Sequence, residues 1–240
     1  MRRKMLCSIS LTATSVLCLM VFQQAALAGP PLICHPFDIG NARSLPFKGP
    51  DWREVDKNYD INRLVEDTVA LLTPETPVLV RMETIRRATV YAVLSLNDYS
   101  AKNAAVADEL LSRLKARIPD PAVKSDKKAT ALALFDYGYA VESYKQAGAA
   151  KQGTNLTGAS EGYGLIVKAL ALDGGDPEME FAAAVACWDR AHIAAHIAHL
   201  QRAVAGAQEG SLLARNLLTH FRDRGKTMAE LRASVATAKN

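Results

Sequence analysis

Apolar residues recur every three or four positions along most of this chain, which is the spacing of one face of an α-helix. Proline, glycine and polar clusters interrupt the pattern at short intervals and divide it into successive segments. No stretch alternates apolar and polar residues as a half-buried strand does. The pattern therefore predicts an all-α protein built from antiparallel helix pairs. The predicted helices cover residues 61–72, 78–96, 101–118, 126–146, 160–172, 177–206, 211–221 and 227–238.

The longest predicted helix begins at Pro177, with Asp176 as its N-cap, and continues without a turn signal to Gly206 or Gly210. It carries one aliphatic stripe, one side with histidines, and a third side made mainly of alanine. A helix with so little charge should be buried on most of its sides. We expect the other helices to pack around it, as an α-solenoid or as an irregular bundle.

Three of the five histidines in the chain fall on one side of this helix. At about 100° per residue, His192, His196 and His199 share a sector of about 60°, and Asp189 lies at its margin. Imidazoles one helical turn apart often bind Zn²⁺ or another divalent metal. One hypothesis is therefore that these four residues form a metal site.

A second interpretation places the same histidines at the polar end of a buried face, or along a groove for a peptide. The apolar residues that continue their sector, and that would line such a groove, are Phe181, Val185 and Trp188. Ile193, Ala194 and Ala195 separate His192 from His196, so the H-E-x-x-H motif of a zinc protease, with its catalytic glutamate, is absent. Zinc-protease chemistry is therefore disfavoured.

Residues 160–190 resemble a junction between two tetratricopeptide repeats (TPRs). Residues 162–169 have the small–large–small spacing of the second helix of a repeat, and residues 181–188 have the spacing of the first helix. The chain departs from the family at Gly174-Gly175, which lengthens the turn, and at Val185, where glycine is usual. The resemblance implies that a protein or peptide binds in a groove, and it transfers no ligand-binding residue. The residues that carry it are Gly162, Ile166, Ala169, Phe181, Ala184 and Trp188.

The first 28 residues have the organisation of a signal peptide. A basic start, Arg2-Arg3-Lys4, precedes an apolar run over residues 6–22, and Ala26-Leu27-Ala28 has the pattern of a cleavage site. Serine and threonine interrupt the apolar run, so it is a poor candidate for a membrane-spanning helix. We expect a periplasmic or secreted protein that starts at Gly29 and has no stable membrane insertion.

Cleavage at this point would lower the formal net charge from +4 to about +1. A nearly neutral exported chain has no basic face for nucleic acid, so we expect no binding to it. The chain also lacks the G-x-S-x-G, Walker and dinucleotide-binding motifs. We therefore expect a non-enzymatic binding or scaffold protein without a cofactor, which recognises a protein or peptide. The alternative is a metal-binding protein or metalloenzyme that uses His192, His196 and His199.

Two cysteines, Cys34 and Cys187, remain after cleavage. In an oxidising compartment two cysteines most simply form one disulfide. This disulfide would close a loop of about 150 residues and stabilise the fold by roughly 4–5 kcal/mol. Two buried thiols, or one reactive thiol, are the alternatives.

Residues 29–60 contain five of the ten prolines and show no helical period. They also contain too many large apolar residues for a free tail. We expect an extended arm that packs on a single helical domain of residues 61–240 and covers one of its edges. A site formed by Cys34-His35-Pro36 and residues 37–40 is the alternative.

Overall fold

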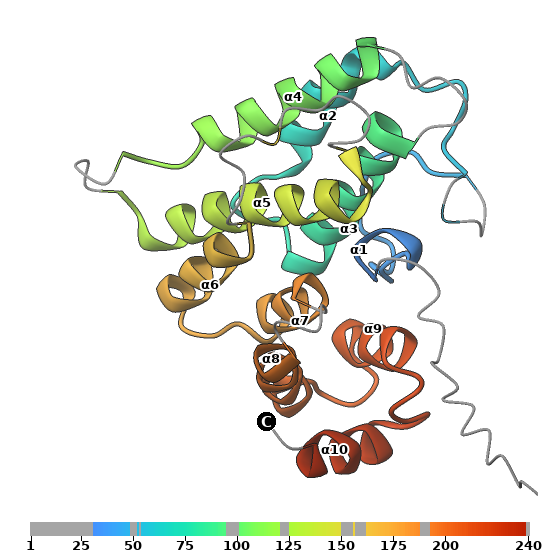
Figure 1. Ribbon diagram of the computed structural model, residues 1–240, viewed down its shortest axis with the longest axis vertical. Coiled ribbons are helices and arrows are strands. Elements are labelled where there is room, and N and C mark those ends of the chain that lie inside the picture. Colours follow the sequence, from blue (N-terminus) through green and yellow to red (C-terminus); the bar gives the residue numbers. More distant parts are fainter. Residues whose placement is uncertain are drawn as a thin grey trace, which may run out of the picture.

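The computed structural model of the chain describes residues 31–48, 52, 54–94, 101–120, 125–149, 156, 162–187 and 193–238. The all-α prediction is confirmed, because these residues form helices and hold no strand beyond one isolated bridge between Phe47 and Val55. No described helix is long and apolar enough to cross a membrane. The elements are α1 (Pro31–Cys34), the 3-10 turn η1 (Ile61–Arg63), α2 (Leu64–Leu71), α3 (Val78–Thr89) and its π-helical continuation η2 (Val90–Leu94), α4 (Ala101–Ala116), α5 (Lys127–Gln146), α6 (Gly162–Asp173), α7 (Pro177–Ala186), α8 (Ile193–Gly206), α9 (Leu212–His220) and α10 (Met228–Thr237) (Figure 1).

Side-chain caps begin several of these helices where the sequence signals place them. The carboxylate of Asp126 accepts the first free N–H groups of α5, and the carboxylate of Asp176 does the same for α7. Thr227 and Glu230 form a capping box at the start of α10. Each cap satisfies backbone donors that have no partner within the helix.

Helices α5 and α6 cross at two glycines and form the most extensive helix contact in the described chain. A Cβ atom on Gly138 would lie 2.6 Å from the carbonyl oxygen of Gly162, and one on Gly162 would lie 2.7 Å from that of Gly138. The absence of side chains here lets the two backbones touch. The pair is antiparallel, because Glu142 contacts the start of α6 while Gly138 approaches Ile166, further along.

The predicted single helix over residues 177–206 is wrong, because two antiparallel helices, α7 and α8, occupy this stretch. Helix α7 ends at Ala186, and its C-cap Cys187 leaves the helical conformation with φ −104° and ψ 38°. Gly206, at the end of α8, lies so close to Pro177, at the start of α7, that a Cβ atom would collide with the proline ring. No proline or glycine marks the break, so packing between the two helices overrides the local preference for one helix.

The described part of the N-terminal arm runs along α3 and reaches α9. The backbone N–H of Phe37 donates to Glu83 of α3 at 3.0 Å, and the N–H and C=O of Asp38 both bond to the side chain of Asn216 on α9 at 2.8 Å. The arm therefore joins the helices shown in the upper part of Figure 1 to those in the lower part.

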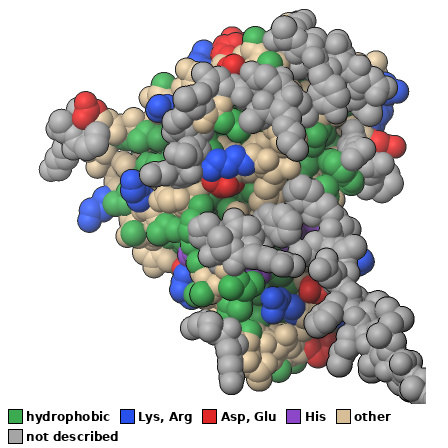
Figure 2. Space-filling model, viewed as in Figure 1, with side chains coloured by type: hydrophobic (Ala, Val, Ile, Leu, Met, Phe, Trp, Pro, Cys, Tyr) green, Lys and Arg blue, Asp and Glu red, His purple; other side chains and the backbone are tan. Residues whose placement is uncertain are grey.

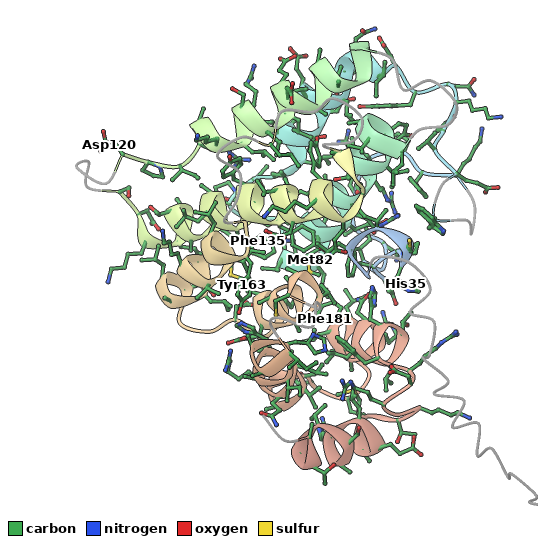
Figure 3. All side chains as sticks on the ribbon, viewed as in Figure 1. His35, Met82, Asp120, Phe135, Tyr163 and Phe181 are labelled. Carbon is green, nitrogen blue, oxygen red and sulfur yellow. The ribbon has the colours of Figure 1, made fainter. Side chains whose placement is uncertain are left out.

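The core lies where α3, α5 and α7 meet, and Figure 3 shows Met82, Phe135 and Phe181 at this place. All three side chains are fully buried. Two arginines of α3 are also fully buried, and the first, Arg81, binds both carboxylate oxygens of Asp136 on α5 at 2.7 and 2.9 Å. This core therefore combines apolar packing with paired charges.

Hydrophobic side chains also reach the surface, and Figure 2 shows them gathered over α5 and α6 on the viewed face. Among the described residues, the large hydrophobic side chains classed as exposed are Val167, Leu172 and Ile193. Apolar atoms make up a large share of the surface of any folded protein, so these three residues do not by themselves mark a site.

Candidate functional site

His196 of α8 is buried and faces α7 rather than an open site. Its Nδ1 lies 2.8 Å from the carbonyl oxygen of Ala184, which can only accept, so Nδ1 carries the proton. Its ring also meets Phe221 edge-on, with 5.7 Å between the ring centroids. Burial lowers the pKa of His196, so the ring is neutral at neutral pH.

His199 takes different partners from those of His196, although both lie on the same face of α8. Its Nδ1 is 2.5 Å from Oε2 of Glu180 on α7 and 2.7 Å from Nη2 of Arg202, and its Nε2 is 2.8 Å from the hydroxyl of Tyr163 on α6. Arg202 donates to the second oxygen of Glu180 at 2.5 Å. Burial lowers the pKa of His199, and Glu180 partly offsets that effect. We call Tyr163, Glu180, His199 and Arg202 the α7–α8 network.

These contacts define what the predicted metal site would require. His192 and Asp189 lie outside the described residues, as does Trp188. Within the described ranges, no three His, Cys, Asp or Glu side chains lie close enough together to hold a metal ion. Both ring nitrogens of His199 are already bonded, so a metal could reach it only by displacing Glu180 or Tyr163. The metal site stays a prediction.

Of the other predicted site residues, Phe181 and Val185 lie in the core, and the two cysteines lie at helix ends. Phe181 and Val185 are 0% and 1% exposed, so in this structure they line no open groove. Cys34 is half-buried at the end of α1, and Cys187 is buried at the end of α7 with its Sγ 3.9 Å from the Ala184 oxygen. The structure has both cysteines as thiols, and their disulfide stays a prediction.

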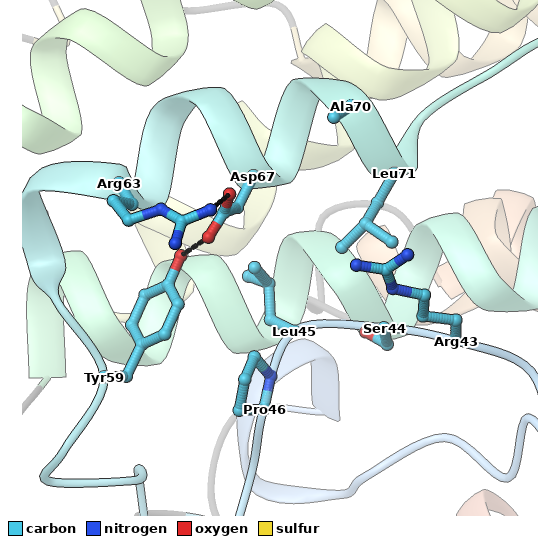
Figure 4. Close-up of a pocket in the computed structure, with 9 residues that line it drawn as sticks. All are labelled: Arg43, Ser44, Leu45, Pro46, Tyr59, Arg63, Asp67, Ala70 and Leu71. Atoms are coloured by element: carbon cyan, nitrogen blue, oxygen red, sulfur yellow. Dashed lines mark hydrogen bonds and ion pairs between the residues drawn. The ribbon is translucent and has the colours of Figure 1, made fainter.

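A pocket between the arm and α2 is the best candidate for a binding site that the structure describes. Its volume is about 380 Å³, and the arm supplies one wall while η1 and α2 supply the other. Figure 4 shows the side chains around it. The lining residues are Arg43, Ser44, Leu45, Pro46, Tyr59, Arg63, Asp67, Ala70 and Leu71.

Polar contacts organise the two ends of this pocket. At one end the carboxylate of Asp67 accepts from the Tyr59 hydroxyl at 2.9 Å and from Arg63 at 3.1 Å. Burial and the bond to Asp67 raise the pKa of Tyr59, so its hydroxyl stays a neutral donor. At the other end Ser44 is bonded to Thr84 of α3 at 2.9 Å. Arg43 forms no ion pair or hydrogen bond with any residue that the structure describes.

The lining residues differ from those of the common nucleophilic catalytic sites. The set contains no histidine, cysteine or glutamate, and Ser44 has no general base beside it, so the pocket lacks an activated nucleophile. Its middle is apolar, with Leu45, Pro46, Ala70 and Leu71, and its ends are polar. Such a combination holds a small apolar group in a fixed orientation.

Sequence reasoning did not select these pocket residues. Arg63 and Asp67 form an i,i+4 pair, which was the one local signal, but such pairs are common on exposed helix faces. Arg43 and Ser44 belong to a segment without periodicity, so nothing local indicates what they face. No family model, curated protein or solved structure matches the chain. The candidate site therefore rests on geometry.

Proposed function

We propose that this protein is an exported, non-enzymatic helical binding protein that recognises a peptide segment of a partner protein. The observation that carries the proposal is the pocket between the arm and α2. Its volume of about 380 Å³ falls within the range of about 300–1,000 Å³ that is usual for ligand pockets. Apolar walls with polar groups at both ends give such a pocket affinity and orientation for one end of a peptide.

The arm wall of this pocket is held in place by α3 and η2. Arg87 donates to the carbonyl oxygen of Leu45 at 2.5 Å, and the Tyr91 hydroxyl donates to that of Pro46 at 2.7 Å. Both bonds fix backbone atoms of the wall through contacts within the protein itself. Preorganisation of this kind lowers the entropy that is lost on binding.

Two features of the sequence support the same class of function. The signal-peptide pattern of residues 1–28 favours a periplasmic or secreted location. The TPR resemblance of residues 160–190 favours recognition of a protein or peptide. This stretch forms α6 and α7, away from the pocket, so it supports the class of function and not the place of the site.

Peptide selection on two matched variants tests the proposal. Ala70 is exposed and lines the pocket, so Ala70→Phe fills the pocket without entering the core. Ala205 on α8 is also exposed, and Ala205→Phe adds the same ring elsewhere. We expect a displayed peptide library to yield a shared motif on the wild-type protein and on Ala205→Phe, and none on Ala70→Phe. Equal enrichment on Ala70→Phe, or no enrichment at all, contradicts the proposal.

A further inference from the structure

We propose that the pocket recognises the C-terminal residue of its peptide, with Arg43 as the anchor for the terminal carboxylate. This inference rests on the proposed function and names the chemistry of the ligand. The inferred ligand is a carboxylate attached to a short apolar group, as it occurs at the C-terminus of a peptide. Three features of the pocket support it: its charge, its apolar wall and its size.

The charge in the pocket favours an anion. Asp67 is the only acidic residue in the lining, and each of its two oxygens already accepts a hydrogen bond, one from Tyr59 and one from Arg63. Arg43 is exposed and pairs with nothing in the described ranges. Its guanidinium therefore leaves the pocket with a net positive charge and with donors that match a carboxylate.

Ser44, beside Arg43, offers a second polar contact. A hydroxyl has one donor and two acceptor positions, and the bond to Thr84 uses only one of these three. When Thr84 is the donor in that bond, the Ser44 proton is free to bind a carboxylate oxygen. Arg43 and Ser44 together can therefore hold the two oxygens of one carboxylate.

The apolar wall lies between this polar pair and the Asp67 end, as Figure 4 shows for Leu45, Pro46 and Leu71. A C-terminal residue carries its side chain and its carboxylate on the same carbon atom, so one residue can contact Arg43 and the apolar wall together. The volume of about 380 Å³ is near the lower end of the range for ligand pockets, which suits one terminal residue.

Calorimetric titration with three probes tests the inference on the full-length mature protein. The probes are a tripeptide that ends in leucine, the same tripeptide with an amidated C-terminus, and octanoate, a carboxylate that has an apolar chain but no peptide group. We expect the free peptide to bind at least about tenfold more tightly than the amide and than octanoate. We also expect added salt to weaken its binding, because the anchoring charge is exposed.

Two charge-matched variants complete the experiment. Arg43→Gln should abolish the difference between free and amidated peptide, whereas Arg222→Gln, in the exposed turn after α9, should keep it. Arg43 has no partner among the described residues, so its replacement should leave the melting temperature unchanged.

The outcomes separate this inference from the proposed function. If the amide binds as tightly as the free peptide, or if Arg43→Gln keeps the difference, carboxylate recognition is wrong while peptide binding stands. If octanoate binds as tightly as the free peptide, the pocket is a site for small acids and C-terminal recognition is wrong. If no probe binds and no library peptide is enriched, both proposals fail.

Discussion

Two charged networks hold different parts of this molecule, and they differ in how completely water is excluded. In the α3 network, which we define as Glu83, Arg86 and Arg87, the side chains of Glu83 and Arg86 are 1% and 0% exposed. In the α7–α8 network the carboxylate is nearly as buried, but the side chain of Arg202 is 52% exposed. Water can therefore replace a lost partner of Arg202 in the second network, but it does not reach the Glu83–Arg86 pair of the first.

The two networks also join different kinds of segment. The arginines of the α3 network bind carbonyl oxygens of the arm, Arg86 at Ile33 and Arg87 at Leu45, and Glu83 accepts the N–H of Phe37. The α7–α8 network links side chains of three helices that already pack together. The α3 network thus orders a chain segment without regular structure, and through Leu45 it shapes one wall of the pocket.

The difference between the two networks predicts that Glu83→Gln causes the largest loss of folding stability. An amide of the same shape leaves the charge of the buried Arg86 without a counter-ion and removes an acceptor from Arg87. Breaking a buried ion pair by removing one partner costs about 3–5 kcal/mol. We expect the free energy of unfolding to fall by about this amount, as measured by urea titration at neutral pH.

A double variant is the control for this prediction. Glu83→Gln with Arg86→Met removes both charges, and apolar replacement of a whole buried pair is often neutral or stabilising. The double variant should therefore be more stable than Glu83→Gln alone. A loss below about 1 kcal/mol for the single variant would show that water reaches the α3 network.

The sequence predicted the positions of the helices better than the burial and the contacts of the charged side chains. Prolines, glycines and N-caps marked most helix boundaries, because these signals act within a few residues. The break after Cys187 could not be predicted, since it depends on contacts such as that between His196 and Ala184 across two helices. The burial of Arg81 was equally hidden, because its partner Asp136 is 55 residues away. Arg86 has a local partner in Glu83, but the arm that covers this pair comes from about 50 residues earlier in the chain.

The candidate site could not be predicted either, because it too depends on contacts between distant segments. Phe181 and Val185 have the spacing of a groove, yet they pack in the core because α8 folds back on α7. The pocket residues come from two segments, and neither segment alone has a pattern that indicates a site. Bonds from Arg87, Tyr91 and Thr84 hold residues 44–46 against α3 and η2, and these contacts lie about 40 residues or more apart in the sequence.

The second largest expected effect is a loss of folding stability at low pH, caused by protonation of His220 at the junction of the arm and α9. His220 stacks on Phe37 with 4.7 Å between ring centroids, and its Nε2 is buried. Burial is the main cause that lowers its pKa from 6.5 to about 4, and the charge of His35 contributes. The unfolded chain therefore binds the proton more tightly than the folded chain. Stability from His220 is complete above pH 6.5 and should fall by about 3 kcal/mol as the pH drops to 4.

Urea titrations between pH 7 and pH 4 measure this effect, with His220→Gln as the control. The variant should be less stable at pH 7, because it loses the packing on Phe37, but its stability should decrease less over this pH range. His196 and His199, whose pKa values are also lowered, add a slope in the same direction in both proteins. Equal slopes in the two proteins would show that His220 is not the source of the pH dependence and would leave it to His35, His196 and His199, whose pKa values are all lowered.

Glu180→Gln is the counterpart of Glu83→Gln in the α7–α8 network, and its effect should be the smallest. The remaining amide oxygen still accepts from Arg202, whose guanidinium is half in water. His199 is neutral and can change its tautomer, so that Nδ1 accepts from the new amide and Nε2 donates to Tyr163. The buried Arg86 of the α3 network cannot adapt in this way, because a guanidinium has only donors. We expect a loss of about 1 kcal/mol by urea titration. A loss equal to that of Glu83→Gln would mean that the carboxylate partner, and not access to water, determines the cost in both networks.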